Sequence, residues 1–356
     1  MKETCLHSRH VALGALMQPF AGFDMPIQYT SIIDEHNAVR HRCGVFDVSH
    51  MGEVFVSGAD AERFVNHIFT NDISTVGPGK VMYGMMCYPD GGTVDDTCIC
   101  KLASDRFLLT INAANIDKDY EWIRQHADGF NVDIDYASDR YGQLAIQGPE
   151  SEKIVEGALG IECHELNFYE VKESGGIIVS RTGYTGEDGF EVYGSPEWIA
   201  DCWDKLMDAK VTPCGLGCRD TLRFEVGLPL YGDELSKDIS PIMAGLSMFV
   251  KLDKPEFIGK EALLKQKTEG VARRLRGIEL DAHAVPRHGY TVLCQGAPVG
   301  EVTTGYRLIS VDKSCAVALV DSKLKLGDRV EIQIRKKTFP GTIVKKKFYD
   351  KHYKKS

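Results

Sequence analysis

The chain of 356 residues lacks the features that direct proteins to membranes or to nucleic acid. No uninterrupted apolar run approaches the length that spans a bilayer. The start of the chain, MKETCLHSRHVALGA, has no apolar segment of the kind found in signal peptides. The formal net charge of −9 disfavours nonspecific binding to nucleic acid. We therefore expect a soluble, cytoplasmic protein that binds neither membranes nor nucleic acid.

The familiar metal and nucleotide motifs are absent as well. The eleven cysteines include no CxxC pair, and the two close spacings, Cys98 to Cys100 and Cys214 to Cys218, do not belong to a four-ligand zinc pattern. Neither GxGxxG nor GK[ST] occurs, which argues against dinucleotide and P-loop sites. We identify no Ser-His or Cys-His arrangement for covalent catalysis. We expect reduced thiols, packed mostly as small apolar groups, and no metal.

Residues 83–115 are the most informative stretch that is present. The turn residues Pro89-Asp90-Gly91-Gly92 lie between two runs rich in β-branched, aromatic and sulfur side chains, which predicts a hairpin. Asp95 and Asp96 follow the turn. Consecutive strand residues face opposite sides, so one acid can face a site while the other faces water or a structural partner. A solvated strand end explains the pair equally well.

The alternation does not say which acid points inward. The set that contains Asp96 is the more apolar, with Val94, Cys98 and Cys100. That pattern would place Asp96 inside if only one face of the strand were covered. If both faces are covered, the pattern decides nothing.

Residues 175–195 form a second informative stretch, in which two strands enclose a glycine-rich loop. Glycines at 183, 186 and 189 let the backbone pass close to another group. Tyr184 and Glu191 could then reach over a planar ligand. A tight hairpin without a ligand fits the same residues.

Two arginines and one histidine complete the polar candidates. Arg219 and Arg223 are four residues apart on an expected helix and share a face, with Asp220 and Glu225 as possible partners. Such a group is usually a structural ion-pair network, and the functional alternative is a guanidinium fork that grips a carboxylate or carbonyl edge. His50 lies at a bend between two expected strands, where a lone histidine is usually a satisfied structural group.

The remaining patterns predict mixed helices and strands, followed by a β-rich end. Helices are expected over residues 31–44, 59–72, 115–128, 151–160, 195–211 and from 259 onward. Ser31 and Ser195 are expected to cap two of them, and Gly44 is expected to end the first. A strand is expected within residues 241–254. Beyond a polar linker at residues 268–276, strand signals dominate and predict a small all-β barrel or sandwich. The basic tail from 345 to 356 fits either an acidic partner or a solvated end.

With these residues laid out, the sequence closely resembles the aminomethyltransferase family, the T-protein of the glycine cleavage system. Ten blocks match in order: DEHNAVR, GVFDVSHMGE, TNDI, YPDGGTVDD, NAAN, AIQGPES, TGYTGEDGFEVY, GLGCRDTLRFE, LYGDEL and FIGKEAL. They span nearly the whole chain, and the C-terminal β domain matches more loosely. Ten ordered blocks are far more specific than any single one.

The resemblance implies an α+β fold, a three-domain cloverleaf around a central folate channel. The folate-binding region would cover residues 1–267 as two interleaved α+β domains, the inserted one at roughly 53–136, with the β domain at 268–356. Tetrahydrofolate would be the co-substrate. The partner would be the lipoylated H-protein, which carries an aminomethyl group on a lipoyl sulfur. The products would be 5,10-methylenetetrahydrofolate, ammonia and the dihydrolipoyl carrier.

The resemblance also implies site residues. The acting carboxylate of the family is the first aspartate of the GGxxDD run, here Asp95, and the acid that grips the pterin falls on Glu191. The remaining folate contacts fall on Arg219, Tyr353, Tyr83, Met51, Asn112 and Tyr184. One departure is Met248, where family members often carry tryptophan.

Two other functions are compatible with a fold of this kind. A folate-binding iron–sulfur assembly factor would carry a KGCYxGQE signature, whereas this chain reads LPLYGDEL there and lacks the cysteine. A flavin-linked demethylase would need an attached flavin domain with a glycine-rich fingerprint, and neither the length nor the motif is present.

Overall fold

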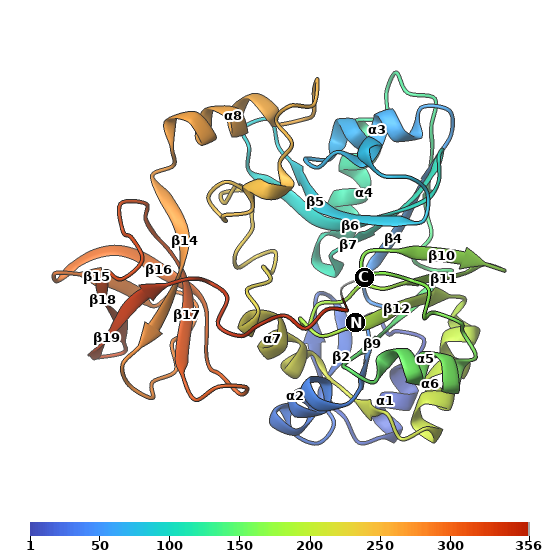
Figure 1. The fold of residues 1–356 in the computed structure, drawn as a ribbon, viewed down its shortest axis with the longest axis horizontal. Coiled ribbons are helices and arrows are strands. Elements are labelled where there is room, and N and C mark those ends of the chain that lie inside the picture. The colour runs from blue at the N-terminus through green and yellow to red at the C-terminus, as the bar shows by residue number, and fades with distance from the viewer. Residues whose placement is uncertain (355–356) are drawn as a thin grey trace. The chain divides into compact units, whose positions relative to one another are not determined.

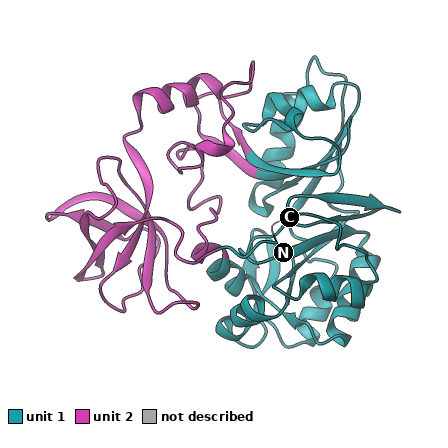
Figure 2. Ribbon diagram, viewed as in Figure 1, with its two compact units in different colours: residues 1–84, 97–222, 351–356 teal, residues 85–96, 223–350 magenta. Residues whose placement is uncertain are grey.

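The computed structural model describes residues 1–354, and the chain divides into two compact units (Figure 2). The first unit comprises residues 1–84, 97–222 and the end of the chain from Lys351, and the second comprises residues 85–96 and 223–350. The hairpin turn of the 83–115 stretch therefore belongs to the second unit, whereas most of its strands belong to the first. Among the described residues, no helix has both the length and the apolar character needed to cross a membrane.

Helices are interspersed with groups of one to three strands through the first three quarters of the chain, and the elements after α8 are all strands (Figure 1). The α-helices are α1 His7–Ala12, α2 Ile32–His41, α3 Ala61–Ile68, α4 Ile116–Gln125, α5 Ser151–Leu159, α6 Pro196–Asp208, α7 Leu216–Glu225 and α8 Lys260–Glu269. The strands up to α7 are β1 Leu16–Phe20, β2 Phe23–Gln28, β3 Gly44–Asp47, β4 Gly52–Ser57, β5 Lys80–Cys87, β6 Thr93–Ala103, β7 Arg106–Ile111, β8 Asp133–Tyr136, β9 Gly142–Gln147, β10 Val171–Ser174, β11 Ile177–Ser180, β12 Gly189–Gly194 and β13 Thr212–Pro213. The strands after α8 are β14 Arg273–Leu280, β15 Thr291–Cys294, β16 Ala297–Arg307, β17 Ser314–Asp321, β18 Arg329–Ile334 and β19 Lys337–Val344.

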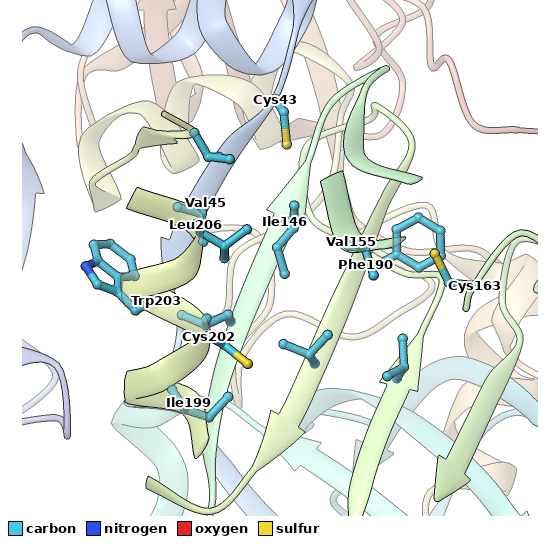
Figure 3. Close-up of a cluster of buried hydrophobic side chains, with 14 of the residues drawn as sticks. Cys43, Val45, Ile146, Val155, Cys163, Phe190, Ile199, Cys202, Trp203 and Leu206 are labelled. Atoms are coloured by element: carbon cyan, nitrogen blue, oxygen red, sulfur yellow. The ribbon is translucent and has the colours of Figure 1, made fainter. Parts of the chain in front are cut away.

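A six-stranded sheet in the order β10-β11-β12-β9-β3-β13 forms the base of the first unit. Helices α5 and α6 cover one face of it, and their apolar residues form a core with the strands (Figure 3). Trp203 and Leu206 of α6 are almost completely buried, as are Ile146 of β9 and Phe190 of β12. Because α6 is amphipathic and capped by Ser195, which accepts a hydrogen bond from the Trp198 N–H, its apolar side faces the sheet.

A second sheet of the first unit has the order β5-β6-β7-β4-β8. Its inner strand β7 is a continuous run of buried residues after Arg106, as expected for a strand covered on both faces. One face packs against the six-stranded sheet: Phe55 and Leu108 share a buried cluster with Ile178 and Tyr193 of β11 and β12. This layer between the two sheets is where the polar residues of interest lie.

The second unit contains a closed six-stranded barrel, β14-β17-β16-β15-β18-β19, in which every pairing is antiparallel. Buried aliphatic side chains such as Ile278, Val302, Val320 and Ile332 fill its interior. Strand signals in the sequence left a barrel and a sandwich open, and the structure has the barrel. The expected α+β class with a small C-terminal β domain is confirmed.

Most expected elements are present, with three local corrections. Helix α2 begins after its predicted cap Ser31, but it ends at His41, and Gly44 is the first residue of β3 instead of a helix stop. Strands β3 and β4 do not pair, because they belong to different sheets. The strand expected within residues 241–254 is wrong: that segment contains the 3₁₀ turn Ser247–Phe249.

We predict that Gly92→Ala destabilises the protein, whereas Gly157→Ala does not. A Cβ atom at Gly92 would lie 2.0 Å from the carbonyl oxygen of Lys237, a contact that requires backbone movement. The expected loss is about 2 kcal/mol or more in the free energy of unfolding. Gly157 is exposed on α5 with open space around it, so alanine there should add about 0.5–1 kcal/mol. Urea denaturation measures both, and equal stability of the two variants would contradict the close approach.

Candidate functional site

Glu191 of β12 is the centre of a polar cluster in the first unit. Its carboxylate accepts hydrogen bonds from the Thr182 hydroxyl and, at 3.0 Å, from the Gln143 side-chain amide. Burial raises the pKa of Glu191, while Thr182, the nearby Arg219 guanidinium and Gln143 each act to lower it. The carboxylate is therefore a partly buried acceptor with donors on several sides.

Arg219 of α7 and Tyr184 of the glycine-rich loop lie beside one another. The guanidinium carbon of Arg219 lies 4.5 Å from the centre of the Tyr184 ring, within the range of a cation–π contact. The charge of Arg219 also acts on Glu191. The structure thus brings together three of the residues predicted from sequence: a carboxylate, a guanidinium and an aromatic face. This combination can bind a flat heterocycle that has both donors and acceptors on its rim.

Two of the three glycines of the loop, Gly183 and Gly189, are explained by one side chain, Gln147. A Cβ atom at Gly183 or Gly189 would lie 1.9 Å or 2.3 Å from the Gln147 amide. That amide donates to the Thr182 carbonyl at 3.0 Å and accepts from the Thr185 hydroxyl at 2.8 Å. The sequence predicted that the glycines let the backbone pass close to another group, and that group is a glutamine of β9.

A buried ion pair that the sequence analysis missed anchors the same loop. Arg40 of α2 donates to Glu187 at 3.0 Å and to the Thr185 carbonyl at 2.6 Å, and it also donates to the Leu222 carbonyl of α7. Arg40 and Glu187 are 6% and 4% exposed. The DEHNAVR and TGYTGEDG motifs contain the two partners, but nothing in either motif says that they meet.

The end of the chain is held in the first unit. The His352 N–H donates to the Gly186 carbonyl at 2.7 Å, and Lys354 pairs with Glu152 at 2.6 Å. Between them, the Tyr353 ring stacks on Phe168 with centroids 4.1 Å apart. Tyr353 therefore belongs to the same unit as Glu191 and Arg219. Residues 355–356 of the expected basic tail lie outside the described residues.

Three further predicted residues of the first unit, Met51, Asn112 and Tyr83, are half-buried. Met51 precedes β4 and Asn112 follows β7. Because Gly52 pairs with Ile111, these two residues lie at the same end of the paired strands. The Tyr83 carbonyl accepts from Asn71 at 2.8 Å. Met248, at the position of the family's tryptophan, is 70% exposed in the second unit.

The two acids after the hairpin turn differ in exposure. Asp95 has no exposed surface, whereas Asp96 is partly exposed. Residues on both faces of β6 are buried, including Val94 and Cys100 on one face and Thr97 and Ile99 on the other. Both faces are covered, so the apolar pattern that would place Asp96 inside carries no information. Of the pair, only Asp96 has exposed surface.

The two arginines of α7 have different surroundings. Arg223 belongs to the second unit, where it is buried and donates to Glu234 at 2.6 Å. Glu234 also accepts from the hydroxyls of Thr303 and Thr304 on β16. Arg223 is thus a member of a structural ion-pair network, as the sequence suggested for arginines near acids, but its partner Glu234 was not among the acids that the sequence suggested.

His50 is buried, but one of its ring nitrogens is not hydrogen-bonded, whereas the sequence predicted a histidine with its hydrogen bonds satisfied. Its Nδ1 atom has no hydrogen-bond partner, and the rings of Phe20 and Phe23 pack edge-on against it at 5.7 and 6.4 Å. Burial lowers its pKa to about 4, and the nearby positive charge of Arg219 acts in the same direction. His50 is therefore a neutral imidazole beside the Glu191 cluster.

Comparisons with known proteins cover almost the whole chain. Residues 6–254 match the family model of the GCVT N-terminal domain, and residues 273–350 match that of the glycine cleavage T-protein C-terminal barrel domain. The chain is 46% identical to an aminomethyltransferase of Lysinibacillus sphaericus over 98% of both chains. It is also 46% identical to one of Caldanaerobacter subterraneus over 100% of this chain and 98% of the other.

A solved structure agrees with these relatives. The crystal structure of the glycine cleavage system aminomethyltransferase T from Bartonella henselae matches with a TM-score of 0.95, at 30% sequence identity and with 99% of each chain covered.

The state of His50 leads to a prediction about stability and pH. The unfolded chain takes up a proton near the usual pKa of 6.5, whereas the folded protein resists protonation down to about pH 4. The contribution of His50 to the free energy of unfolding is therefore present above pH 6.5 and declines as the pH falls toward 4, by up to about 3 kcal/mol. Urea denaturation across this range should give a shallower pH dependence for His50→Gln. His41→Gln, on the exposed side of α2, serves as the control, and identical slopes for His50→Gln and wild type would contradict the assignment.

Proposed function

Because the chain belongs to the aminomethyltransferase family, the T-protein of the glycine cleavage system, we propose that it transfers a one-carbon unit to tetrahydrofolate. The donor is an aminomethyl group on the lipoyl sulfur of the H-protein. The products are 5,10-methylenetetrahydrofolate, ammonia and the dihydrolipoyl H-protein. Family models that cover both the N-terminal region and the barrel support this assignment.

The observation that carries the proposal is the cluster of Glu191, Arg219 and Tyr184. A pterin presents an amine and a ring N–H on one edge, which suit a carboxylate acceptor, and a carbonyl, which suits a guanidinium donor. The hydrogen bonds from Thr182 and Gln143 hold the Glu191 carboxylate in place before a ligand arrives. Such preorganisation lowers the cost of ordering the site on binding. Tyr353, Met51, Asn112 and Tyr83 are proposed as further folate contacts.

The acid pair after the hairpin turn supplies the electrostatic part of the reaction. The aminomethyl carbon passes from sulfur to a folate nitrogen as an iminium-like centre while ammonia leaves. A carboxylate beside that carbon stabilises the developing positive charge and guides a proton. The resemblance assigns this role to Asp95, whereas exposure favours Asp96, because Asp95 has no surface that a ligand can touch. The comparison of single variants decides between them.

We predict that Glu191→Gln weakens tetrahydrofolate binding by about 10- to 100-fold, because a charged acceptor is lost and an amide hydrogen now faces the ligand's donors. Calorimetric titration of the folded protein measures the affinity. Glu197→Gln, an exposed acid on α6, is the matched control and should bind as the wild type does. Wild-type affinity in Glu191→Gln would remove Glu191 from the site.

We further predict that one of Asp95→Asn and Asp96→Asn loses most of the turnover while keeping its affinity for folate. A loss of about 100-fold or more corresponds to about 3 kcal/mol of transition-state stabilisation. The assay follows 5,10-methylenetetrahydrofolate formation with aminomethylated H-protein, and calorimetry checks folate binding in the same preparations. The inactive variant identifies the acting acid, and near-normal turnover in both would refute a carboxylate role for this pair.

A further inference from the structure

Two side chains in the layer between the sheets of the first unit contain buried polar atoms without hydrogen-bond partners. The carboxyl group of Glu53 on β4 has no exposed surface, and neither of its oxygens has a partner. The amide oxygen of Gln143 on β9 is buried and also lacks one. Nearly all buried polar atoms in proteins are paired with protein or ordered water, so both groups need an explanation.

The strand register pairs each of these two residues with one of two residues that contact each other. Glu53 is directly opposite Thr110 on β7, and Gln143 is directly opposite Tyr193 on β12. The hydroxyls of Thr110 and Tyr193 lie 3.4 Å apart across the two sheets. Side chains directly opposite on antiparallel strands have Cβ atoms about 5 Å apart. A continuous path of neighbours therefore leads from Glu53 to Gln143.

The chain itself brings the two residues to the same region. The Glu53 N–H donates to the Ser138 hydroxyl at 2.8 Å, and the Ala137 N–H donates to the Glu53 carbonyl at 2.9 Å. Gln143 follows Ser138 by five residues on the same segment. The segment that leads into β9 is thus tied to β4 at Glu53.

The two groups are complementary if Glu53 carries a proton. Burial raises the pKa of Glu53 well above its usual value, and the nearby polar groups of Ser138 and of the Glu53 backbone offset only part of that rise. A protonated carboxyl has one O–H donor, and the Gln143 amide oxygen is an acceptor that lacks a donor. The other end of the Gln143 amide donates to Glu191.

We propose that Glu53 is a positioning residue, whose carboxylic acid donates through one buried water to the Gln143 amide oxygen and so keeps the amide nitrogen directed at Glu191. One bridging water spans about 5–6 Å between the groups that it joins. The water would satisfy otherwise orphaned atoms of both residues. This inference rests on the proposed role of Glu191 in folate binding.

The orientation of the amide matters because its two ends have opposite effects on Glu191. With nitrogen toward Glu191, the amide donates to the carboxylate and favours its charged form. With oxygen toward Glu191, two acceptors would face each other across a buried gap, which is unfavourable. An ionised Glu53 would favour this wrong orientation, because it would attract the amide nitrogen. A neutral acid at position 53 avoids the conflict.

The test compares Glu53→Met with Glu53→Gln. Methionine removes the donor, so tetrahydrofolate affinity should fall about fivefold, the equivalent of one hydrogen bond. Glutamine retains a donor of the same length and should restore the wild-type affinity. Ser151→Ala, which removes a buried hydroxyl without a partner at the start of α5, is the control and should leave the affinity unchanged. Unchanged folate affinity in Glu53→Met would overturn the proposal.

A double-mutant cycle separates positioning from a general effect on the fold. If Glu53 acts through Gln143, then Glu53→Met should weaken folate binding in the wild-type background but not in Gln143→Met. Equal weakening in both backgrounds would contradict the route through Gln143. Thermal unfolding of each variant accompanies the affinities, because a purely structural role would lower stability and affinity together. Removing a buried acid without a protein partner should instead leave stability unchanged or raise it.

Infrared spectroscopy tests the proton directly and without a ligand. The wild type at pH 7 should show the C=O stretch of a protonated carboxylic acid, with a shift in D₂O, and Glu53→Gln should lack that band. Absence of the band from the wild type would refute the neutral acid. If the wild type failed to bind tetrahydrofolate, the proposed function would fall, whereas the infrared band would still report on Glu53.

Discussion

The candidate site depends on one constraint: the Glu191 carboxylate lies between two sheets, where the loss of its water is unfavourable in free energy. A buried carboxylate is unfavourable unless donors replace its lost water. Here each donor comes from a different element: Thr182 from the loop after β11, Gln143 from β9 and the charge of Arg219 from α7. The loop, the sheet and the helix must therefore keep fixed positions relative to one another within the first unit.

The loop keeps its position through two side chains that do not belong to it. Gln147 fills the space that Gly183 and Gly189 leave, and it forms hydrogen bonds to the loop on both sides of Tyr184. Arg40 ties Glu187 and the Thr185 carbonyl to α2, and its bond to the Leu222 carbonyl continues to α7. Removal of one partner from such a buried pair leaves an uncompensated charge, which typically costs 3–5 kcal/mol. The network fixes the position of Tyr184 relative to Arg219, because Tyr184 lies in the loop and Arg219 lies on α7.

The sequence was most informative where a local rule decides the structure. Ser31 and Ser195 were predicted as helix caps and accept the expected backbone hydrogen bonds, and the Pro89–Gly92 turn joins β5 to β6. Strand signals beyond the linker at residues 268–276 indicated a β domain, and the chain forms a barrel there. These features depend on residues that are close in sequence, so they can be read from the sequence alone.

Features that depend on distant residues could not be predicted in the same way. Strands β3 and β4 are separated only by a short bend, yet they join different sheets, and no local signal distinguishes this from a hairpin. The burial of Asp95 depends on what covers each face of β6. The meeting of Arg40 with Glu187 depends on a separation of 147 residues. The resemblance to a family supplied candidate roles, but it could not show which neighbours hold each side chain.

Glu53 illustrates why an alternating pattern in a strand does not establish whether a polar side chain is buried or exposed. In β4 the residues Glu53, Phe55 and Ser57 share one face. Because Glu53 and Ser57 are polar, the sequence would suggest that this face is exposed to solvent. Phe55 instead packs between the sheets, so the whole face near it is covered and Glu53 is shielded from bulk solvent. A glutamate in that place is tolerated because it can hold a proton and serve as a hydrogen-bond donor, which an exposed glutamate at neutral pH does not do. Its value to the site lies in this neutral state, and the layer that shields Glu53 from bulk solvent is the same layer that holds Gln143 and Glu191.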